Sequence, residues 1–272
     1  MPTFATPGPI AATVQVAGAR VRVTVSDRTD TVVLVEPIDA ASRSNVKVAN
    51  KTKVEFAGGQ LSVKTTAAGD KNGSVAITID LPAGSSLVAY LAHSAVQADG
   101  SFGDCELHVA SGRVQLERID ALQANIAGGE VTIGHVAGRA TVDGSAGQVR
   151  IGHASADLDL STGSGGFDIG RADGSITAKT ASGAIRIGRM ANGQAKLMSG
   201  SGNIEVGIGE GTAASIDANS EQGAVHNFVA SQANADPSDQ KVMVYARTRH
   251  GDIIIQRAQQ ADPHELSVTS TS

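Results

Sequence analysis

The strongest constraint on this chain is an internal repeat of about eighteen residues. A short segment in which polar and apolar residues alternate after a small residue recurs between residues 94 and 255. The anchors of these segments are a serine followed by eight glycines: Ser94, Gly112, Gly129, Gly147, Gly165, Gly183, Gly202, Gly223 and Gly251. The first six spacings between anchors are 17 to 19 residues, and the last two are 21 and 28. Self-similarity at a fixed period is the signature of a repeat architecture.

Apolar side chains stand at fixed distances from each anchor. Two residues after the anchors come Val96, Val114, Val131, Val149, Phe167, Ile185, Ile204, Val225 and Ile253. Four residues after them come Ala98, Leu116, Ile133, Ile151, Ile169, Ile187, Val206, Asn227 and Ile255, so only Asn227 interrupts this file. Seven residues before them come Leu87, Cys105, Leu122, Ala140, Leu158, Ile176, Ala195, Ile216 and Val244. Alternation with period two predicts strands whose inward side chains form these files, and it buries Cys105 in the core.

The repeat predicts an all-β fold, a β-solenoid of about 18-residue turns. A single turn cannot bury its own apolar face, so neighbouring turns must stack about 4.8 Å apart. The composition agrees, because 32 glycines, 5 phenylalanines, 2 tyrosines and no tryptophan suit a narrow core of small aliphatic side chains. Stacking in chain order would leave the last turn, at Ile253–Ile255, as an open edge.

Three regions follow along the chain. Residues 1–85 are strand-rich without the clean period, and we expect an N-terminal β cap with a short helix at residues 44–50. Residues 86–257 form the solenoid, and residues 230–239 are expected to be a loop that projects from the last turns. The polar residues 258–272 are expected to be a disordered tail.

Charge and hydropathy limit the partners. The formal net charge is −5, which disfavours nucleic acid as a partner. The sequence contains no run of eighteen apolar residues, so membrane insertion is not expected. The first nine residues contain neither the basic segment nor the apolar segment of a secretory signal. We therefore expect a cytoplasmic protein.

One outward file is chemically distinctive. Six residues after successive anchors stand five basic or imidazole side chains: Arg118, His135, His153, Arg171 and Arg189. Stacked turns would place them about 4.8 Å apart, where like charges repel unless carboxylates or a bound anion intervene. Asp120 and Asp173 are the carboxylates expected to do so. The file is a candidate docking ladder for an acidic partner, and a solvated, internally compensated face is the alternative.

No catalytic, cofactor or metal site is predicted. His135 and His153 lack a third ligand at a matching position, which makes a poor zinc site. Asp168 lies in a stretch similar to a calcium-binding repeat, but the other repeats carry no aspartate there. The glycine clusters complete neither a dinucleotide nor a phosphate-loop fingerprint, and no pair of outward carboxylates suits glycosidic chemistry.

The motif Gly-x-Val-x-Ile-Gly, preceded by Leu-x-Ala-x-Thr-x-x-Gly, resembles a bacterial β-strand-repeat family of adhesin-like proteins and domains of unknown function. The segments at residues 1–4, 26–33 and 246–255 resemble the actinobacterial branch of that family, which lacks signal peptides. The resemblance covers nearly the whole chain and implies the repeat fold. It implies no catalytic residue.

Three functions are consistent with the sequence. The leading hypothesis is a non-enzymatic cytoplasmic scaffold that binds a protein partner through its rigid faces. The second is a structural protein that self-associates into filaments through the solenoid ends. The third is the adhesin-like surface role that the resemblance implies.

Overall fold

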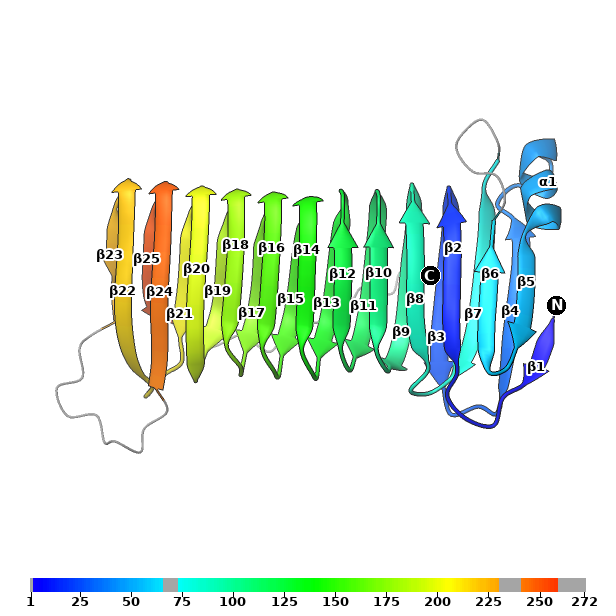
Figure 1. Cartoon of the computed structure of the whole chain (residues 1–272), viewed down its shortest axis with the longest axis horizontal. Helices are drawn as coiled ribbons and strands as arrows, with labels where there is room; N and C mark the ends of the chain where they lie inside the picture. Colours follow the sequence, from blue (N-terminus) through cyan, green and yellow to red (C-terminus); the bar gives the residue numbers. More distant parts are fainter. Residues whose placement is uncertain (1, 66–72, 230–240, 259–272) are drawn as a thin grey trace.

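The computed structural model describes residues 2–65, 73–229 and 241–258, and these residues are almost entirely β-strand. They form two long sheets that face each other along one flattened rod (Figure 1). Each coil of the chain contributes one strand to each sheet, and neighbouring coils pair in parallel. The predicted all-β solenoid is therefore confirmed.

The strands of the two sheets are numbered in chain order. Sheet A runs through thirteen described strands in the order β1 (Thr3–Ala5), β4 (Asp30–Pro37), β7 (Val75–Pro82), β3 (Ala19–Ser26), β9 (Ser94–Phe102), β11 (Gly112–Ile119), β13 (Glu130–Val136), β15 (Gln148–Ala154), β17 (Phe167–Ala172), β19 (Ile185–Met190), β21 (Ile204–Ile208), β25 (Ile253–Arg257) and β23 (Val225–Asn227). Sheet B runs through twelve in the order β22 (Ala213–Gln222), β24 (Lys241–His250), β20 (Gly193–Ser201), β18 (Ile176–Ser182), β16 (Leu158–Ser164), β14 (Ala140–Ala146), β12 (Leu122–Ile126), β10 (Cys105–Val109), β8 (Ser86–Ala92), β2 (Ala11–Ala17), β6 (Gln60–Lys64) and β5 (Lys53–Ala57).

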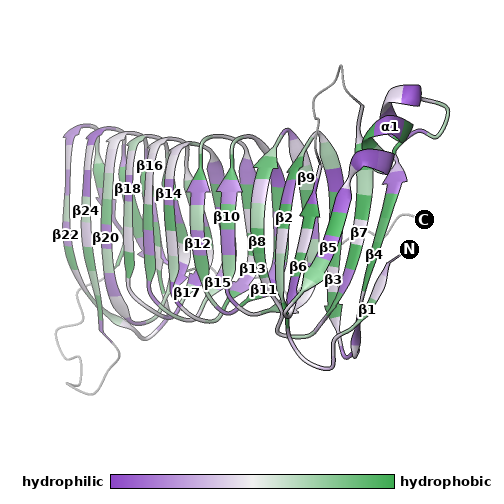
Figure 2. Ribbon diagram, turned by 45° about the vertical axis from the view of Figure 1, so that its right-hand side comes forward, coloured by the Kyte–Doolittle hydropathy of each residue, from purple (hydrophilic) through white to green (hydrophobic). Residues whose placement is uncertain are grey.

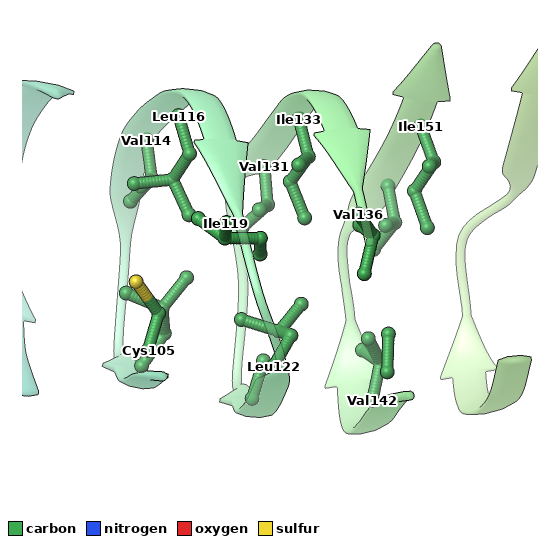
Figure 3. Close-up of a cluster of buried hydrophobic side chains, with 14 of the residues drawn as sticks. Cys105, Val114, Leu116, Ile119, Leu122, Val131, Ile133, Val136, Val142 and Ile151 are labelled. Atoms are coloured by element: carbon green, nitrogen blue, oxygen red, sulfur yellow. The ribbon is translucent and has the colours of Figure 1, made fainter. Parts of the chain in front are cut away.

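The core between the sheets consists of the predicted apolar files. In Figure 3, Val131 and Ile133 of sheet A point toward Leu122 and Val142 of sheet B. All four side chains are buried, and the apolar stripes continue along the rod in Figure 2. Cys105 is buried as predicted, and desolvation raises the pKa of its thiol to about 12. Each sheet contributes one layer of inward side chains to the core. Aliphatic side chains are therefore large enough to fill most of the space between the two sheets.

The anchor glycines allow the corners of neighbouring coils to touch. Gly165 has φ of 128°, and a Cβ atom placed on it would overlap the carbonyl oxygen of Gly147 on the preceding coil. An L-residue with a side chain meets both a strained backbone and a steric overlap at such a corner. The glycine at this point of the repeat is therefore a condition of stacking at one strand spacing per coil.

A file of buried hydroxyls supports the same corners. Thr180 Oγ1 donates to the carbonyl oxygen of Gly165 at 3.0 Å, and Ser199 Oγ donates to that of Gly183 at 3.0 Å. Thr248 Oγ1 donates to the Gly202 carbonyl oxygen at 3.0 Å. Each hydroxyl satisfies a carbonyl that the close approach has removed from water. The repeat pattern contains these hydroxyls, but it does not reveal their partners.

The last coils do not stack in chain order. Strand β24 pairs with β20 on one side and β22 on the other, and β25 lies between β21 and β23. The coil β24–β25 is thus inserted between β20–β21 and β22–β23, and the outermost coil visible in Figure 1 is β22–β23. The expected open edge at Ile253–Ile255 is wrong, because β25 has a strand on both sides.

The difference in hydrophobicity between the last two coils explains this stacking order. The coils β22–β23 and β24–β25 both match the repeat. Ile253 and Ile255 of β25 are fully buried, whereas Val225 of β23 is 42% exposed and Asn227 is also exposed. An inserted coil is covered on both faces, so the more apolar copy gains more there. Val225 keeps the predicted register beside the inward Ile253 but is uncovered on its outer side, and the interruption at Asn227 marks an end coil.

The opposite end of the rod is closed by antiparallel strands. The coil β2–β3 lies inside the stack, between β8–β9 and β6–β7. Beyond it, three antiparallel pairs close the rod: β1 with β4, β4 with β7, and β5 with β6. Phe4 stacks on Phe56 with ring centroids 4.9 Å apart. The expected helix is present as α1 (Arg43–Lys51), which packs near β4 and β7. The expected loop at residues 230–239 and the tail beyond residue 258 lie outside the described residues.

We predict that Gly165→Ala lowers the free energy of unfolding by about 3 kcal/mol, because it adds backbone strain and overlaps Gly147. Gly211→Ala is the matched control, since Gly211 also has positive φ but has open space around it. Its loss is expected to be about 1 kcal/mol. Urea denaturation followed by circular dichroism measures both. Equal losses would show that corner contact does not limit stacking.

Candidate functional site

The five outward side chains of the predicted file lie in register on sheet A. Successive members are ladder partners on β11, β13, β15, β17 and β19. We call this set the cationic ladder: Arg118, His135, His153, Arg171 and Arg189. The structure brings all five together along the rod, and their docking role remains a prediction.

A local break in strand alternation turns the ladder outward. In β13, the inward residues Ile133 and Val136 are separated by two residues, Gly134 and His135, instead of one. The first of the two is a glycine in most coils because the backbones approach closely there: a Cβ on Gly152 would lie 2.7 Å from the carbonyl oxygen of Gly134. The second residue, His135 in β13, therefore projects outward near the end of its strand.

A second file accompanies the ladder, two residues further along each coil. Its backbone amides bond to the preceding coil in the same way, with Asp120 N to Phe102 O at 3.2 Å, Ala137 N to Ile119 O at 3.0 Å, Ser155 N to Val136 O at 2.9 Å and Asp173 N to Ala154 O at 2.9 Å. These four positions are therefore structurally equivalent, and Ala191 follows Met190, which pairs with Ala172 immediately before Asp173. We call this set the companion file: Asp120, Ala137, Ser155, Asp173 and Ala191. A constant offset of eight from the anchors is the sequence signal for it.

Asp173 compensates the middle of the ladder, as expected. Its Oδ2 lies 2.7 Å from His153 Nε2, and its Oδ1 accepts a hydrogen bond from Arg171 Nε at 3.0 Å. Partial burial acts to raise the pKa of Asp173, but the bonds from Arg171 and His153 outweigh it and hold the pKa below its usual value. The carboxylate thus bridges ladder residues of two neighbouring coils.

The expectation for Asp120 is wrong. Asp120 makes no ion pair within the described residues, and neither do Arg118 and Arg189, which are exposed. Both aspartates stand two residues after a ladder arginine, but only Asp173 also has a ladder histidine on the preceding coil, whereas Arg118 is paired with Ser101 there. The ladder therefore carries an uncompensated arginine at each end.

His135 is held differently from His153. Its Nε2 lies 2.9 Å from Ser155 Oγ, and its ring centroid lies 4.8 Å from that of His153. Its Nδ1 is buried without a hydrogen-bond partner in the described part of the chain. Desolvation first, then the neighbouring His153 and Arg118, lower the pKa of His135. Ser155 and His135 thus form a contact pair with no carboxylate on the second ring nitrogen.

Other chemistry is sparse in the parts of the chain that the structure describes. No group of three or more histidine, cysteine, aspartate or glutamate side chains is placed to hold a metal ion there. Within the same ranges, no helix has the length and apolarity that a bilayer crossing requires.

Residues 13–256 match the Toastrack DUF4097 family. The match spans most of the chain and includes every strand of the ladder. The chain belongs to the Toastrack DUF4097 family. No curated protein matches the sequence.

Solved structures of bacterial proteins are similar over nearly the whole chain. A candidate adhesin from Bacteroides fragilis is 11% identical, with a TM-score of 0.48, over 94% of this chain and 95% of that one. A candidate adhesin from Parabacteroides distasonis is 13% identical, with a TM-score of 0.45, over 93% and 95%. A candidate cell adhesion protein from Clostridium sporogenes is 12% identical, with a TM-score of 0.23, over 94% and 98%.

We predict that the fold loses stability in two steps as the pH falls. The folded pKa of His135 is below its ordinary 6.5, so its stabilising contribution is present above that pH and is lost as the pH falls below it. Asp173, whose pKa is also lowered, adds a second loss below about pH 3.8.

Urea denaturation between pH 8 and pH 3 measures both steps. His135→Gln is expected to remove the upper step and Asp173→Asn the lower one. An unchanged profile in both variants would contradict these assignments.

Proposed function

We propose that this protein is a non-enzymatic, cytoplasmic interaction scaffold whose cationic ladder docks an acidic segment of a partner protein. The observation that carries the proposal is the ladder itself: five side chains in register, with a single bridging carboxylate among the described residues. Arg118 and Arg189 are exposed and make no ion pair within the described residues, so they are available to a partner. The parallel stack fixes their spacing before a partner arrives, which lowers the cost of ordering them.

The expected affinity comes from several weak contacts. An exposed ion pair contributes about 0.2–1 kcal/mol, so one arginine cannot hold a partner. Because the pairs are exposed, they act mainly on association rate and specificity, and salt weakens them. A ladder of aligned sites suits an extended partner segment better than a single charged residue.

An adhesin-like surface role is the second candidate. It is supported by the names of the structural neighbours, which describe adhesins. The ladder would serve either role, and the compartment separates them. Fractionation of cells that express the tagged protein distinguishes a cytosolic scaffold from a protein at the envelope.

Filament formation is the third candidate, and it would use a different contact surface from the one expected at Ile253–Ile255. In the described part of the chain, the strands at this end of the two sheets are β22 and β23, so the edge at this end lies there and not at β25. The sheets end at β1 and β5 on the opposite side. Concentration-dependent sedimentation of the purified protein would favour this candidate over a scaffold.

We predict that Arg171→Glu with Arg189→Glu abolishes recovery of the docked partner in native affinity purification, because it reverses two ladder charges. Lys64→Glu with Lys196→Glu makes the same change in net charge on the exposed face of sheet B and is the matched control. The proposal expects at least one protein that the control retains and the ladder variant loses. Identical sets of recovered proteins would exclude the ladder as a docking face.

A further inference from the structure

We infer that Ala137 and Ala191 form the floors of two carboxylate-binding slots on the cationic ladder, and that one extended acidic segment of the partner fills both. The inference rests on the proposed docking function and names the chemistry of the partner. It follows from comparing the companion file with its one bridging carboxylate.

Asp173 is the internal template for a filled slot. Its carboxylate sits between two ladder residues, His153 of the preceding coil and Arg171 of its own coil, at 2.7 and 3.0 Å. The chain itself therefore shows that this position between two rungs of the ladder accommodates a carboxylate. It is only partly exposed, and the bound anion lowers the repulsion between rungs.

Ala137 occupies the equivalent position two coils before Asp173. The backbone bond of Ala137 N to Ile119 O, at 3.0 Å, matches that of Asp173 N to Ala154 O, at 2.9 Å. Arg118 stands where His153 stands for Asp173 and supplies the positive charge at this slot. His135 stands where Arg171 does, but its Nε2 is engaged by Ser155. A methyl group replaces the carboxylate, so the cation of Arg118 has no ion-pair partner there within the described residues.

Ala191 marks the second slot. Arg171 and Arg189 are ladder partners on β17 and β19, and Ala172 pairs with Met190 immediately before Ala191. Two arginines flank this slot, and Arg189 makes no ion pair in the described ranges. An incoming carboxylate would relieve their repulsion as Asp173 does one coil earlier.

The rest of the companion file sets the register of the ligand. Asp120 and Asp173 repel a carboxylate placed on their coils, and Ser155 engages His135 at 2.9 Å. Within the companion file, the two alanines are the positions that carry neither a carboxylate nor a hydroxyl bonded to the ladder. The file therefore discriminates between acidic segments by the spacing of their carboxylates, and not only by their total charge.

The spacing fits an extended peptide. The two slots lie three coils apart, which is about 14 Å at 4.8 Å per coil. Residues four apart on a β-strand are separated by about 13–14 Å and point to the same side. The partner segment is therefore an extended stretch with acidic residues at positions i and i+4.

The test measures binding of a fluorescent peptide, Thr-Glu-Thr-Val-Thr-Glu-Thr, by anisotropy at low salt, beside the same peptide with both glutamates changed to glutamine. Ala137→Asp and Ala191→Asp fill the slots from within, and each is expected to weaken binding about fivefold, the upper range for one exposed ion pair. Ala137→Asn and Ala191→Asn are neutral controls of the same size and are expected to bind nearly as wild type. Asp173→Ala frees Arg171 and is expected to strengthen binding. Thermal unfolding checks that each variant is folded.

Equal binding by the wild type and both aspartate variants would overturn the slots, as would equal binding of the two peptides. Binding of polygalacturonate in place of the glutamate peptide would also overturn them, because it would show a different class of ligand. Loss of the cellular partner with Arg171→Glu and Arg189→Glu, but not with the aspartate variants, would reject the slots and leave the docking function standing.

Discussion

The contact between the corners of neighbouring coils is the constraint on which the structure depends. Coils pair along two parallel sheets only if their backbones approach within one strand spacing at the turns as well. Gly165 and its equivalents leave room for the carbonyl of the preceding coil, and buried hydroxyls such as Thr180 satisfy those carbonyls from inside. The stacked coils then form continuous files of buried side chains between the sheets, most of them aliphatic.

Much of the fold could be predicted from the sequence because the repeat places equivalent residues at equivalent offsets. The burial of Cys105 and the ladder register of His135 with His153 both follow from that offset alone. The order of the last coils does not follow, because β22–β23 and β24–β25 match the same template. The difference lies in how completely each copy is buried: Ile255 is covered on both sides, and Asn227 tolerates an exposed end.

The candidate site was also predicted only in part from the sequence. Which side chains share a ladder is a property of the backbone, so the sequence predicted it. Which of them pair is a property of side-chain reach across coils, so it could not be predicted: Asp173 bridges two rungs, while Asp120 bridges none among the described residues. A rigid ladder with fixed spacing and incomplete compensation is the feature on which the proposed docking function depends.

Hydrogen exchange of the native protein tests the stacking order most directly. Slow exchange requires strands paired on both sides, so the amides of β25 (Ile253–Arg257) should exchange as slowly as those of β19 (Ile185–Met190). The amides of β23 (Val225–Asn227) should exchange much faster, because they lie at the end of the stack. Slow exchange in β23 with fast exchange in β25 would mean that the coils stack in chain order, and it would contradict the insertion of β24–β25 between its neighbours.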